Sequence, residues 1–406
     1  MPLGRRDFLK GALALGLGAV GAATVLENLR RALPEVQPEN LPFYARPARF
    51  SLSVKGNSRC GDCHSGPPRS QVAFCHTEHR GTYVKCRLCP KGCLISEGHR
   101  GDCQTRENRG GVLHTMTYGN PCSLAVDPIE KKPFYHFLPG TTALSLATAG
   151  CNLHCLYCQN WQISQFPPEK VDFIRLFPEQ VVDSALQEKS PSIAFTYSEP
   201  TIFYEYMCDT ARLARAQGVR SVVISAGYIN PEPLQELCGL VDAIKIDLKG
   251  INERFYEEVC SATLAPVLEA IRIIARSGIH LEIVNLVVPT LNDDPEDMRR
   301  LARWVCDQAG PDVPLHFSRF QPQYRLQNLP PTPVESLEQA RQAGLEEGLH
   351  YVYIGNVPGH EGNNTFCPRC GQVVIRRSGF TVTEMYLQDG HCAHCGEPIA
   401  GVWTAE

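Results

Sequence analysis

The central part of the chain alternates short apolar runs with longer segments in which apolar residues recur every three or four positions. The apolar runs are rich in β-branched residues and cover residues 143–150, 192–198, 221–227, 243–249, 281–289 and 314–320. Near-continuous apolar runs of this length are typical of strands that are covered on both faces, as in a parallel sheet. The pattern therefore predicts six buried parallel strands.

Amphipathic segments separate these runs, and they predict helices over residues 178–189, 202–218, 265–278 and 294–310. Gly218, Gly278 and Gly310 stand where helix C-caps belong. Strands that alternate with helices predict an α/β fold, and six such units can close most of a TIM-like barrel. We expect this partial (β/α)6 barrel over residues 138–358. In parallel barrels, functional residues gather at the carboxyl ends of the strands.

Charge and cysteine content narrow the class of protein. The 406 residues include 39 Lys and Arg and 43 Asp and Glu, a net charge of −4, so we expect no nucleic-acid partner. Most of the 19 cysteines stand in groups, which indicates metal ligation rather than a disulfide framework. The five outside the groups are interpreted as small, buried apolar residues: Cys122, Cys208, Cys238, Cys260 and Cys306.

The group CNLHCLYC directly follows the first predicted strand and places Cys151, Cys155 and Cys158 in a C-x3-C-x2-C pattern. A [4Fe-4S] cluster normally takes four thiolates, so three cysteines leave one iron without a protein ligand, and no fourth thiol is expected nearby. The pattern resembles the cluster loop of radical SAM enzymes, which implies that S-adenosylmethionine (SAM) binds the open iron. A zinc site that borrows His154 is the alternative.

Polar residues at the ends of the later strands are candidates for binding SAM. Glu199 matches the glutamate of a Gly-Gly-Glu element in that superfamily, although Tyr197 and Ser198 replace the glycines. Asp247 and Lys249 resemble the D-x-K element of glycyl-radical-enzyme activases, and strand alternation sends both to one side. The complete candidate set is Ser198, Glu199, Ser225, Gly227, Asp247, Lys249, Asn285 and His316.

Cysteine-rich modules flank the predicted barrel at residues 60–120 and 361–406. The first contains Cys86, Cys89, Cys93 and Cys103, four thiols within 18 residues that suit zinc or a second Fe-S cluster. The second has two C-x2-C pairs, typical of a structural zinc ribbon, with rubredoxin-like iron as the alternative. Its cysteines are Cys367, Cys370, Cys392 and Cys395.

The segment CGDCH contains Cys60, Cys63 and His64 in the C-x-x-C-H pattern of covalent c-type haem attachment. Cys75, His76 and His79 follow closely and could instead complete a zinc site with the two cysteines. Haem, zinc and no cofactor remain open alternatives here.

The N-terminal residues 1–33 have the layout of a twin-arginine export signal or anchor, because an Arg pair precedes an uncharged run at residues 11–26. A Pro-rich linker is expected over residues 34–59. These features predict a periplasmic or membrane-anchored protein. SAM and strong reductants are cytosolic, so a cytoplasmic location remains the alternative.

Several whole segments within residues 84–370, among them VDPIEKKPFYHFLPG, CNLHCLYCQNWQIS and HFSRFQPQY, closely resemble the radical SAM protein of the AmmeMemoRadiSam system. That family is related to pyruvate formate-lyase-activating enzymes. The resemblance implies an enzyme that reductively cleaves SAM and abstracts hydrogen from a protein or a small molecule, with glycyl radical formation as one version. It also implies an electron donor of ferredoxin or flavodoxin type. The alternative is an Fe-S and haem electron-transfer protein that does not cleave SAM.

Overall fold

The computed structural model describes residues 41–54 and 83–404. The expected export signal and the haem or zinc candidates Cys60, Cys63 and His64 lie outside the described residues. Within the described ranges, none of the helices is long and apolar enough to cross a bilayer.

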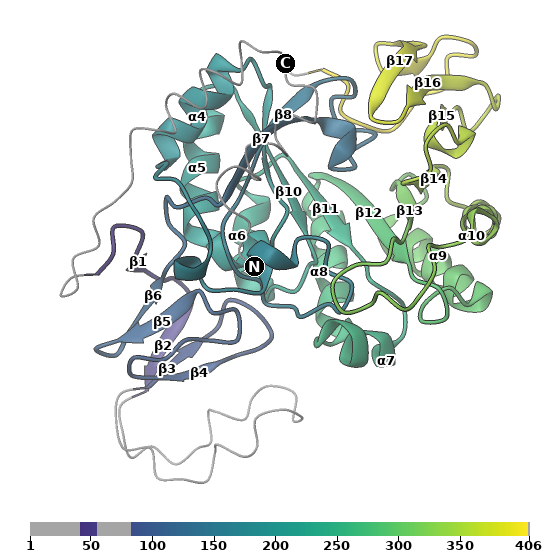
Figure 1. The fold of residues 1–406 in the computed structure, drawn as a ribbon. Coiled ribbons are helices and arrows are strands. Elements are labelled where there is room, and N and C mark those ends of the chain that lie inside the picture. The colour runs from purple at the N-terminus through teal and green to yellow at the C-terminus, as the bar shows by residue number, and fades with distance from the viewer. Residues whose placement is uncertain (1–40, 55–82, 405–406) are drawn as a thin grey trace.

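The centre of the molecule is an eight-stranded sheet in the order β14-β13-β12-β11-β10-β9-β8-β7 (Figure 1). The six predicted strands are confirmed as β8 (Thr142–Ala147), β9 (Ser192–Phe195), β10 (Arg220–Ser225), β11 (Ala243–Asp247), β12 (His280–Val287) and β13 (Leu315–Arg319). The sequence pattern missed β14 (Val352–Gly355), which continues the parallel sheet, and β7 (Ser123–Pro128), which pairs antiparallel with β8.

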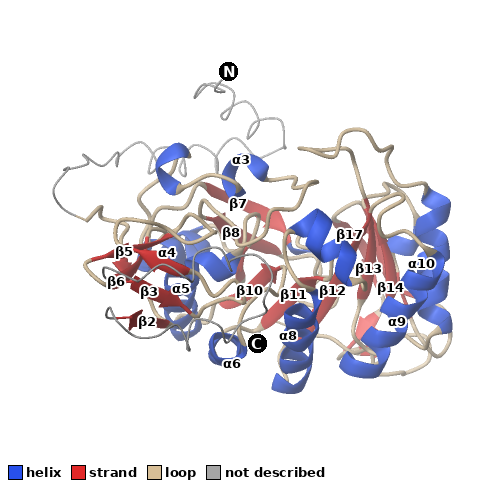
Figure 2. Ribbon diagram, turned by 90° about the horizontal axis from the view of Figure 1, so that it is seen from below, coloured by secondary structure: helices blue, strands red, loops and turns tan. Residues whose placement is uncertain are grey.

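Six helices connect successive parallel strands: α4 (Pro178–Gln187), α5 (Tyr204–Ala216), α6 (Pro231–Cys238), α8 (Leu264–Ser277), α9 (Pro295–Ala309) and α10 (Val334–Glu346). The sheet ends at β7 and β14, which do not pair with each other, so the barrel stays open (Figure 2). This architecture confirms the predicted partial (β/α)6 barrel.

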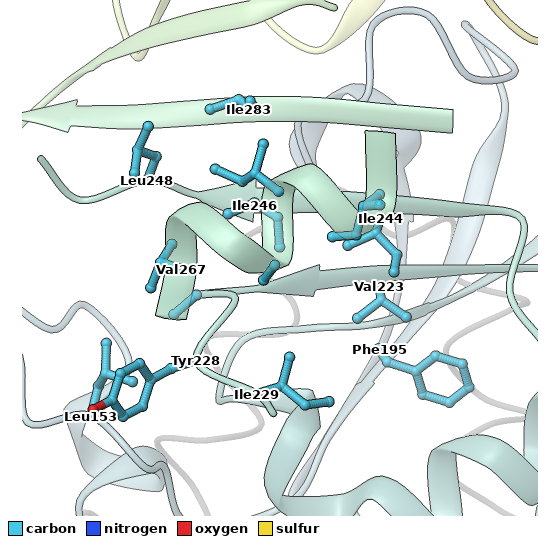
Figure 3. Packing of buried hydrophobic residues seen from close by; sticks show 14 of the residues in the cluster. Leu153, Phe195, Val223, Tyr228, Ile229, Ile244, Ile246, Leu248, Val267 and Ile283 are labelled. Carbon is cyan, nitrogen blue, oxygen red and sulfur yellow. The ribbon is translucent and has the colours of Figure 1, made fainter. Parts of the chain in front are cut away.

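Strand alternation divides the sheet into an apolar face and a polar face. Val223, Ile244, Ile246 and Ile283 belong to the large buried cluster that the helices complete (Figure 3). On the opposite face, Lys245 is paired in register with Glu282 on the neighbouring strand. Because the helices cover the apolar side, the polar side chains line the inside of the barrel.

The segment between β7 and β8 closes the amino end of the barrel. Phe134 and Phe137 pack against residues in the first half of several strands, including Ala143 and Ala243. Glu282 holds the same segment, because its carboxylate accepts hydrogen bonds from the backbone N–H groups of residues 135 and 136 at 2.8–3.0 Å and from the side chains of His280 and His316.

The Glu282 carboxylate should stabilise the fold most at neutral pH. Burial tends to raise its pKa, but the hydrogen bonds from His280 and His316 outweigh burial and hold that pKa well below the usual range. The stabilisation is therefore complete above the unfolded pKa of about 4.3 and is lost as the pH falls toward the folded pKa. We expect Glu282→Gln to lower the free energy of unfolding at pH 7 by about 2–4 kcal/mol.

Urea unfolding at pH 7 and at pH 4 measures this contribution. The loss of stability between the two pH values should be smaller in the Gln variant than in the parent. An equal loss in both proteins contradicts the role given to Glu282.

Two small modules lie at opposite ends of the sheet (Figures 1 and 2). The N-terminal module has two three-stranded sheets, formed by β1 (Arg46–Pro47), β5 (Arg106–Arg109) and β6 (Val112–Thr115), and by β2 (Ser51–Val54), β3 (Tyr83–Cys86) and β4 (Leu94–Ser96). The C-terminal module contains β15 (Thr365–Phe366), β16 (Val373–Ser378), β17 (Thr381–Met385), β18 (Leu387–Gln388) and β19 (His391–Cys392).

Candidate functional site

The loop with Cys151, Cys155 and Cys158 leaves the carboxyl end of β8, where parallel barrels place their functional residues. Neighbouring segments hold its backbone. The N–H groups of residues 154 and 156 donate to the carbonyls of Cys260 and Val259, at 3.0 and 2.9 Å. Both acceptors belong to a π-helix, Tyr256–Cys260, an irregular element that is frequent at functional sites. The loop is therefore held at two places: by its connection to β8 and by hydrogen bonds to the π-helix that follows β11.

The three thiols do not form the compact group that a single ion needs. Ligand atoms on one zinc lie about 3.8 Å apart, because Zn–S bonds are about 2.3 Å long. Among the described residues, only the group at the C-terminus has three or more ligand atoms within 4.8 Å of one another. Thiolates of a cluster each bind a different iron and stand further apart.

His154 does not support the zinc alternative. Its Nε2 lies 3.1 Å from the Asp102 carboxylate and its Nδ1 lies 2.9 Å from Oε1 of Gln165. Because both ring nitrogens already have partners, the imidazole has no free nitrogen for a metal.

Cys260 is the main correction to the sequence analysis, which expected no fourth thiol near the loop. The Cys155 thiol is hydrogen-bonded to that of Cys260, and this bond together with burial raises the pKa of Cys155. The Tyr157 hydroxyl also lies 3.7 Å from the Cys260 sulfur. Cys260 is fully buried as expected, but it contacts a predicted cluster ligand. The local spacing of residues 151–158 carries no signal for a thiol that lies about 100 residues away.

Asp247 and Lys249 form an ion pair at the end of β11, with Oδ2 and Nζ 3.0 Å apart. Burial opposes the charge on Lys249, but attraction to Asp247 and to the thiols of Cys155 and Cys260 raises its pKa. Lys245, which the sequence analysis missed, pairs with the other oxygen of Asp247. This carboxylate and its two lysines therefore lie beside the cysteine loop.

Glu199 joins the ends of β9 and β10. Its carboxylate accepts hydrogen bonds from the backbone N–H and the hydroxyl of Thr201, from the hydroxyl of Ser225 and from the backbone N–H of Ala226, all within 2.7–3.0 Å. Ser198 donates its hydroxyl to the Thr148 carbonyl. These hydrogen bonds hold the side chains of Glu199 and Ser225 together at the barrel mouth. Their contact with SAM stays a prediction.

The other three candidates have partners inside the fold. Gly227 has φ +69°, and a Cβ there would meet Ile246 and Val267 at 3.3 and 3.4 Å. Asn285 donates to the Leu248 carbonyl at 2.8 Å. His316 is the second residue of β13 and lies 2.7 Å from Glu282, so it belongs to the amino half of the barrel. No contact described for these three supports a role in SAM binding, which stays a prediction.

A second group of charges lies on the inner face, and the sequence analysis did not single it out. The Lys132 ammonium lies 2.5 Å from the Asp127 carboxylate and donates to the hydroxyl of Tyr197 at 3.2 Å. Burial lowers the pKa of Lys132 to about 8, against the attraction of Asp127. The antiparallel strand β7 brings Asp127 to this place.

The first four-cysteine set lies directly against the cysteine loop. Gly150, which precedes Cys151, has φ +97°, and a Cβ there would lie 2.3 Å from Thr105 Cγ2 and 2.8 Å from the Cys103 carbonyl oxygen. Since backbone occupies part of this space, we expect Gly150→Ala to cost about 2–4 kcal/mol in unfolding free energy and to displace the loop.

Gly218→Ala is the matched control, because Gly218 has φ +73° and no atom lies within 4 Å of the position that its added methyl group would take. Strain alone should cost about 1 kcal/mol there. Denaturant unfolding of both variants measures the difference, and equal losses contradict the tight contact at Gly150.

The four cysteines of the C-terminal module form a compact group. The sulfurs of Cys367 and Cys395 are 3.6 Å apart, and those of Cys370 and Cys392 are 3.8 Å apart. All four ligand atoms lie within 4.8 Å of one another, so the group could hold a metal ion.

Comparison with known proteins places this arrangement in a family. The model of the radical SAM superfamily matches residues 145–304. An uncharacterised protein of Methanocaldococcus jannaschii is 51% identical over 318 residues, which are 78% of this chain and 95% of that protein.

Two further relatives are named for an activity. The pyruvate formate-lyase-activating enzyme of Clostridium pasteurianum is 21% identical over 216 residues, 49% of this chain and 87% of that enzyme. The isethionate sulfite-lyase activating enzyme of Desulfovibrio desulfuricans is 27% identical over 300 residues, 70% of this chain and 89% of that enzyme. The chain therefore belongs to the radical SAM superfamily and is an enzyme related to the pyruvate formate-lyase-activating enzymes.

Proposed function

We propose that this enzyme binds a [4Fe-4S] cluster through Cys151, Cys155 and Cys158 and cleaves SAM reductively there. The cluster supplies one electron to the sulfonium of SAM, which releases methionine and a 5′-deoxyadenosyl radical. The observation that carries the proposal is a loop of three thiols at the carboxyl end of β8, in a chain that matches the radical SAM superfamily.

The protein's own groups would position SAM. Lys249 and Asp247 lie beside the cysteine loop and suit the carboxylate and the ammonium of the methionine part. Glu199 and Ser225 hold the ends of β9 and β10 together next to them. The barrel wall would exclude water from the radical.

The substrate is a hydrogen donor, either a protein or a small molecule. Relatives named as activating enzymes support a glycyl-radical-activase-like reaction on a protein partner. The resemblance to the AmmeMemoRadiSam protein rests on the segments quoted above. A low-potential donor of ferredoxin or flavodoxin type would supply the electron.

Anaerobic incubation of the reconstituted full chain with SAM and dithionite tests the proposal. We expect 5′-deoxyadenosine and methionine in equal amounts, detected by mass spectrometry. Protein that holds an intact cluster and forms neither product would refute the proposal.

A second candidate function is electron transfer without SAM cleavage, and Cys260 is the observation that favours it. Once its hydrogen bond to Cys155 is broken and the two sulfurs separate, the Cys260 thiol could serve as a fourth ligand and close the open iron. The paired variants in the Discussion separate the two functions.

We also propose metal ligands in the cysteine groups that flank the barrel. Zinc suits the compact C-terminal group, since its 3.6 and 3.8 Å sulfur separations are close to those expected around one tetrahedral ion. Haem or zinc at Cys60, Cys63 and His64 stays a proposal, and metal analysis of a Cys60→Ser variant tests it.

Export through the twin-arginine route is likewise proposed from the sequence. Cell fractionation of the parent and of an Arg5→Lys, Arg6→Lys variant tests it. Retention of both proteins in the cytoplasm would support the cytoplasmic alternative.

A further inference from the structure

The N-terminal module contains a cavity with four thiols in its wall. Leu88, Ile95 and Ile202 supply apolar parts of the lining. The cysteines that line it are Cys86, Cys89, Cys93 and Cys103. Thiolates gathered around an apolar cavity are the usual surroundings of an iron-sulfur cluster.

The spacing of these thiols helps to distinguish a cluster site from a zinc site. No three of them have sulfurs that all lie within 4.8 Å of one another, whereas the C-terminal group of the same chain meets that limit with four. One tetrahedral ion needs sulfurs about 3.8 Å apart. The N-terminal set therefore lacks the compact arrangement that a single tetrahedral ion needs.

Charges and donors around the cavity suit an anionic cluster. Arg106 lines it and is 1% exposed, and its Nε has no hydrogen-bond acceptor among the described residues. Lys91 lines the same cavity, but it is ion-paired with Asp102 at 2.9 Å, as Arg106 is with Glu205 at 2.7 Å. Two sulfurs already accept hydrogen bonds, Cys93 from the Asp102 backbone N–H at 3.4 Å and Cys103 from the Thr105 hydroxyl at 3.2 Å. N–H and O–H donors near the sulfurs stabilise a reduced cluster.

The cavity shares a wall with the cysteine loop of the barrel. Asn152, the residue after Cys151, lines the cavity, and Gly150 on the other side of Cys151 packs against the Cys103 backbone. Asp102, which lines the cavity, also accepts a hydrogen bond from Nε2 of His154, a residue of the cysteine loop. The segments that carry the two cysteine sets are therefore in direct contact.

We propose that Cys86, Cys89, Cys93 and Cys103 hold a second [4Fe-4S] cluster, which relays electrons from a low-potential protein donor to the centre at Cys151, Cys155 and Cys158. The relay part rests on the proposed function. The step moves one electron and no atoms. The donor loses the electron, the second cluster carries it, and cleavage of the sulfonium C–S bond of SAM consumes it at the barrel centre.

The first test removes the barrel centre from the full chain with a triple variant, Cys151→Ser, Cys155→Ser and Cys158→Ser. After anaerobic reconstitution and reduction, we expect about four irons and four sulfides in the N-terminal site. We also expect an EPR signal of a reduced cubane that SAM does not change. Adding Cys86→Ser and Cys103→Ser should remove this signal. Zinc in place of iron in the triple variant, or a signal that survives all five substitutions, overturns the proposal.

The second test keeps the barrel centre and carries only Cys86→Ser and Cys103→Ser. Dithionite is small enough to reduce the barrel centre directly, so 5′-deoxyadenosine formation with dithionite should persist. The rate with reduced flavodoxin should fall by at least about tenfold. Equal rates with both reductants, or equal loss with both, contradict the relay.

Cys306→Ala is the control variant, because Cys306 lies on α9 with its sulfur beside Gly348, and it is half-buried rather than buried as the sequence predicted. It should keep both rates. Parent protein that forms no 5′-deoxyadenosine with dithionite refutes the proposed function instead, and it leaves the result of the triple variant intact.

Discussion

Replacing Cys155 by alanine should reduce formation of 5′-deoxyadenosine by at least about a hundredfold, because a cluster with two protein ligands is not held in place. Cys155 is the buried member of the three thiols and faces the segment after β11. The expected loss concerns the barrel centre alone, so iron or zinc at the other cysteine groups should remain. Anaerobic metal analysis and product assay with dithionite measure both quantities.

Cys260→Ala is the matched partner of this variant. If Cys260 only hydrogen-bonds Cys155, the alanine variant keeps the cluster and cleaves SAM at a rate within about threefold of the parent. If Cys260 is the fourth ligand of a closed cluster, the parent cleaves no SAM and the variant opens the iron.

For the first variant, full activity of Cys155→Ala would contradict the assignment of the loop.

Removal of metal from the C-terminal module should have the second large effect. Structural zinc contributes about 10–16 kcal/mol of apparent binding energy in small domains. Apart from two cysteines, the module's own fully buried apolar residues are few, chiefly Val374, Ile375 and Ile399. We therefore expect a chelator, or Cys370→Ser, to unfold residues 365–400.

Hydrogen exchange measured by mass spectrometry checks this expectation. Peptides from β16 and β17 should lose protection, while those from β10 to β12 keep it. Several contacts join the module to the segment between β7 and β8, so this segment should also loosen. Arg377 donates to the Tyr135 carbonyl at 2.8 Å, and Nδ1 of His136 lies 2.5 Å from the Ala400 carbonyl. Unchanged protection in metal-free protein contradicts a structural metal.

The sequence predicted the features that depend on local pattern. The strands β8 to β13 were found because each is a continuous apolar run, whereas the segments between them have the periodicity of amphipathic helices. The cysteine loop was found because its three thiols lie within eight residues. β14 was missed although it is as long as β9, which was found, and β7 was missed because its burial is intermediate along most of its length.

Features that depend on tertiary contact were not predictable in the same way. Cys260 reaches Cys155 through a π-helix after β11, and no spacing rule connects the two. Lys132 and Tyr197 meet because β7 runs antiparallel beside β8. His316 was a candidate for binding SAM, and its bond to Glu282 depends on the register of β12 and β13.

EPR of the reduced protein, before and after addition of SAM, tests the central claim most directly. The best sample is a Cys86→Ser, Cys103→Ser variant reduced with dithionite, because its remaining cubane signal comes from the loop at Cys151. If SAM binds an open iron there, the g-values of the reduced cluster shift on addition of SAM. A reduced cubane signal that stays unchanged at saturating SAM contradicts the account.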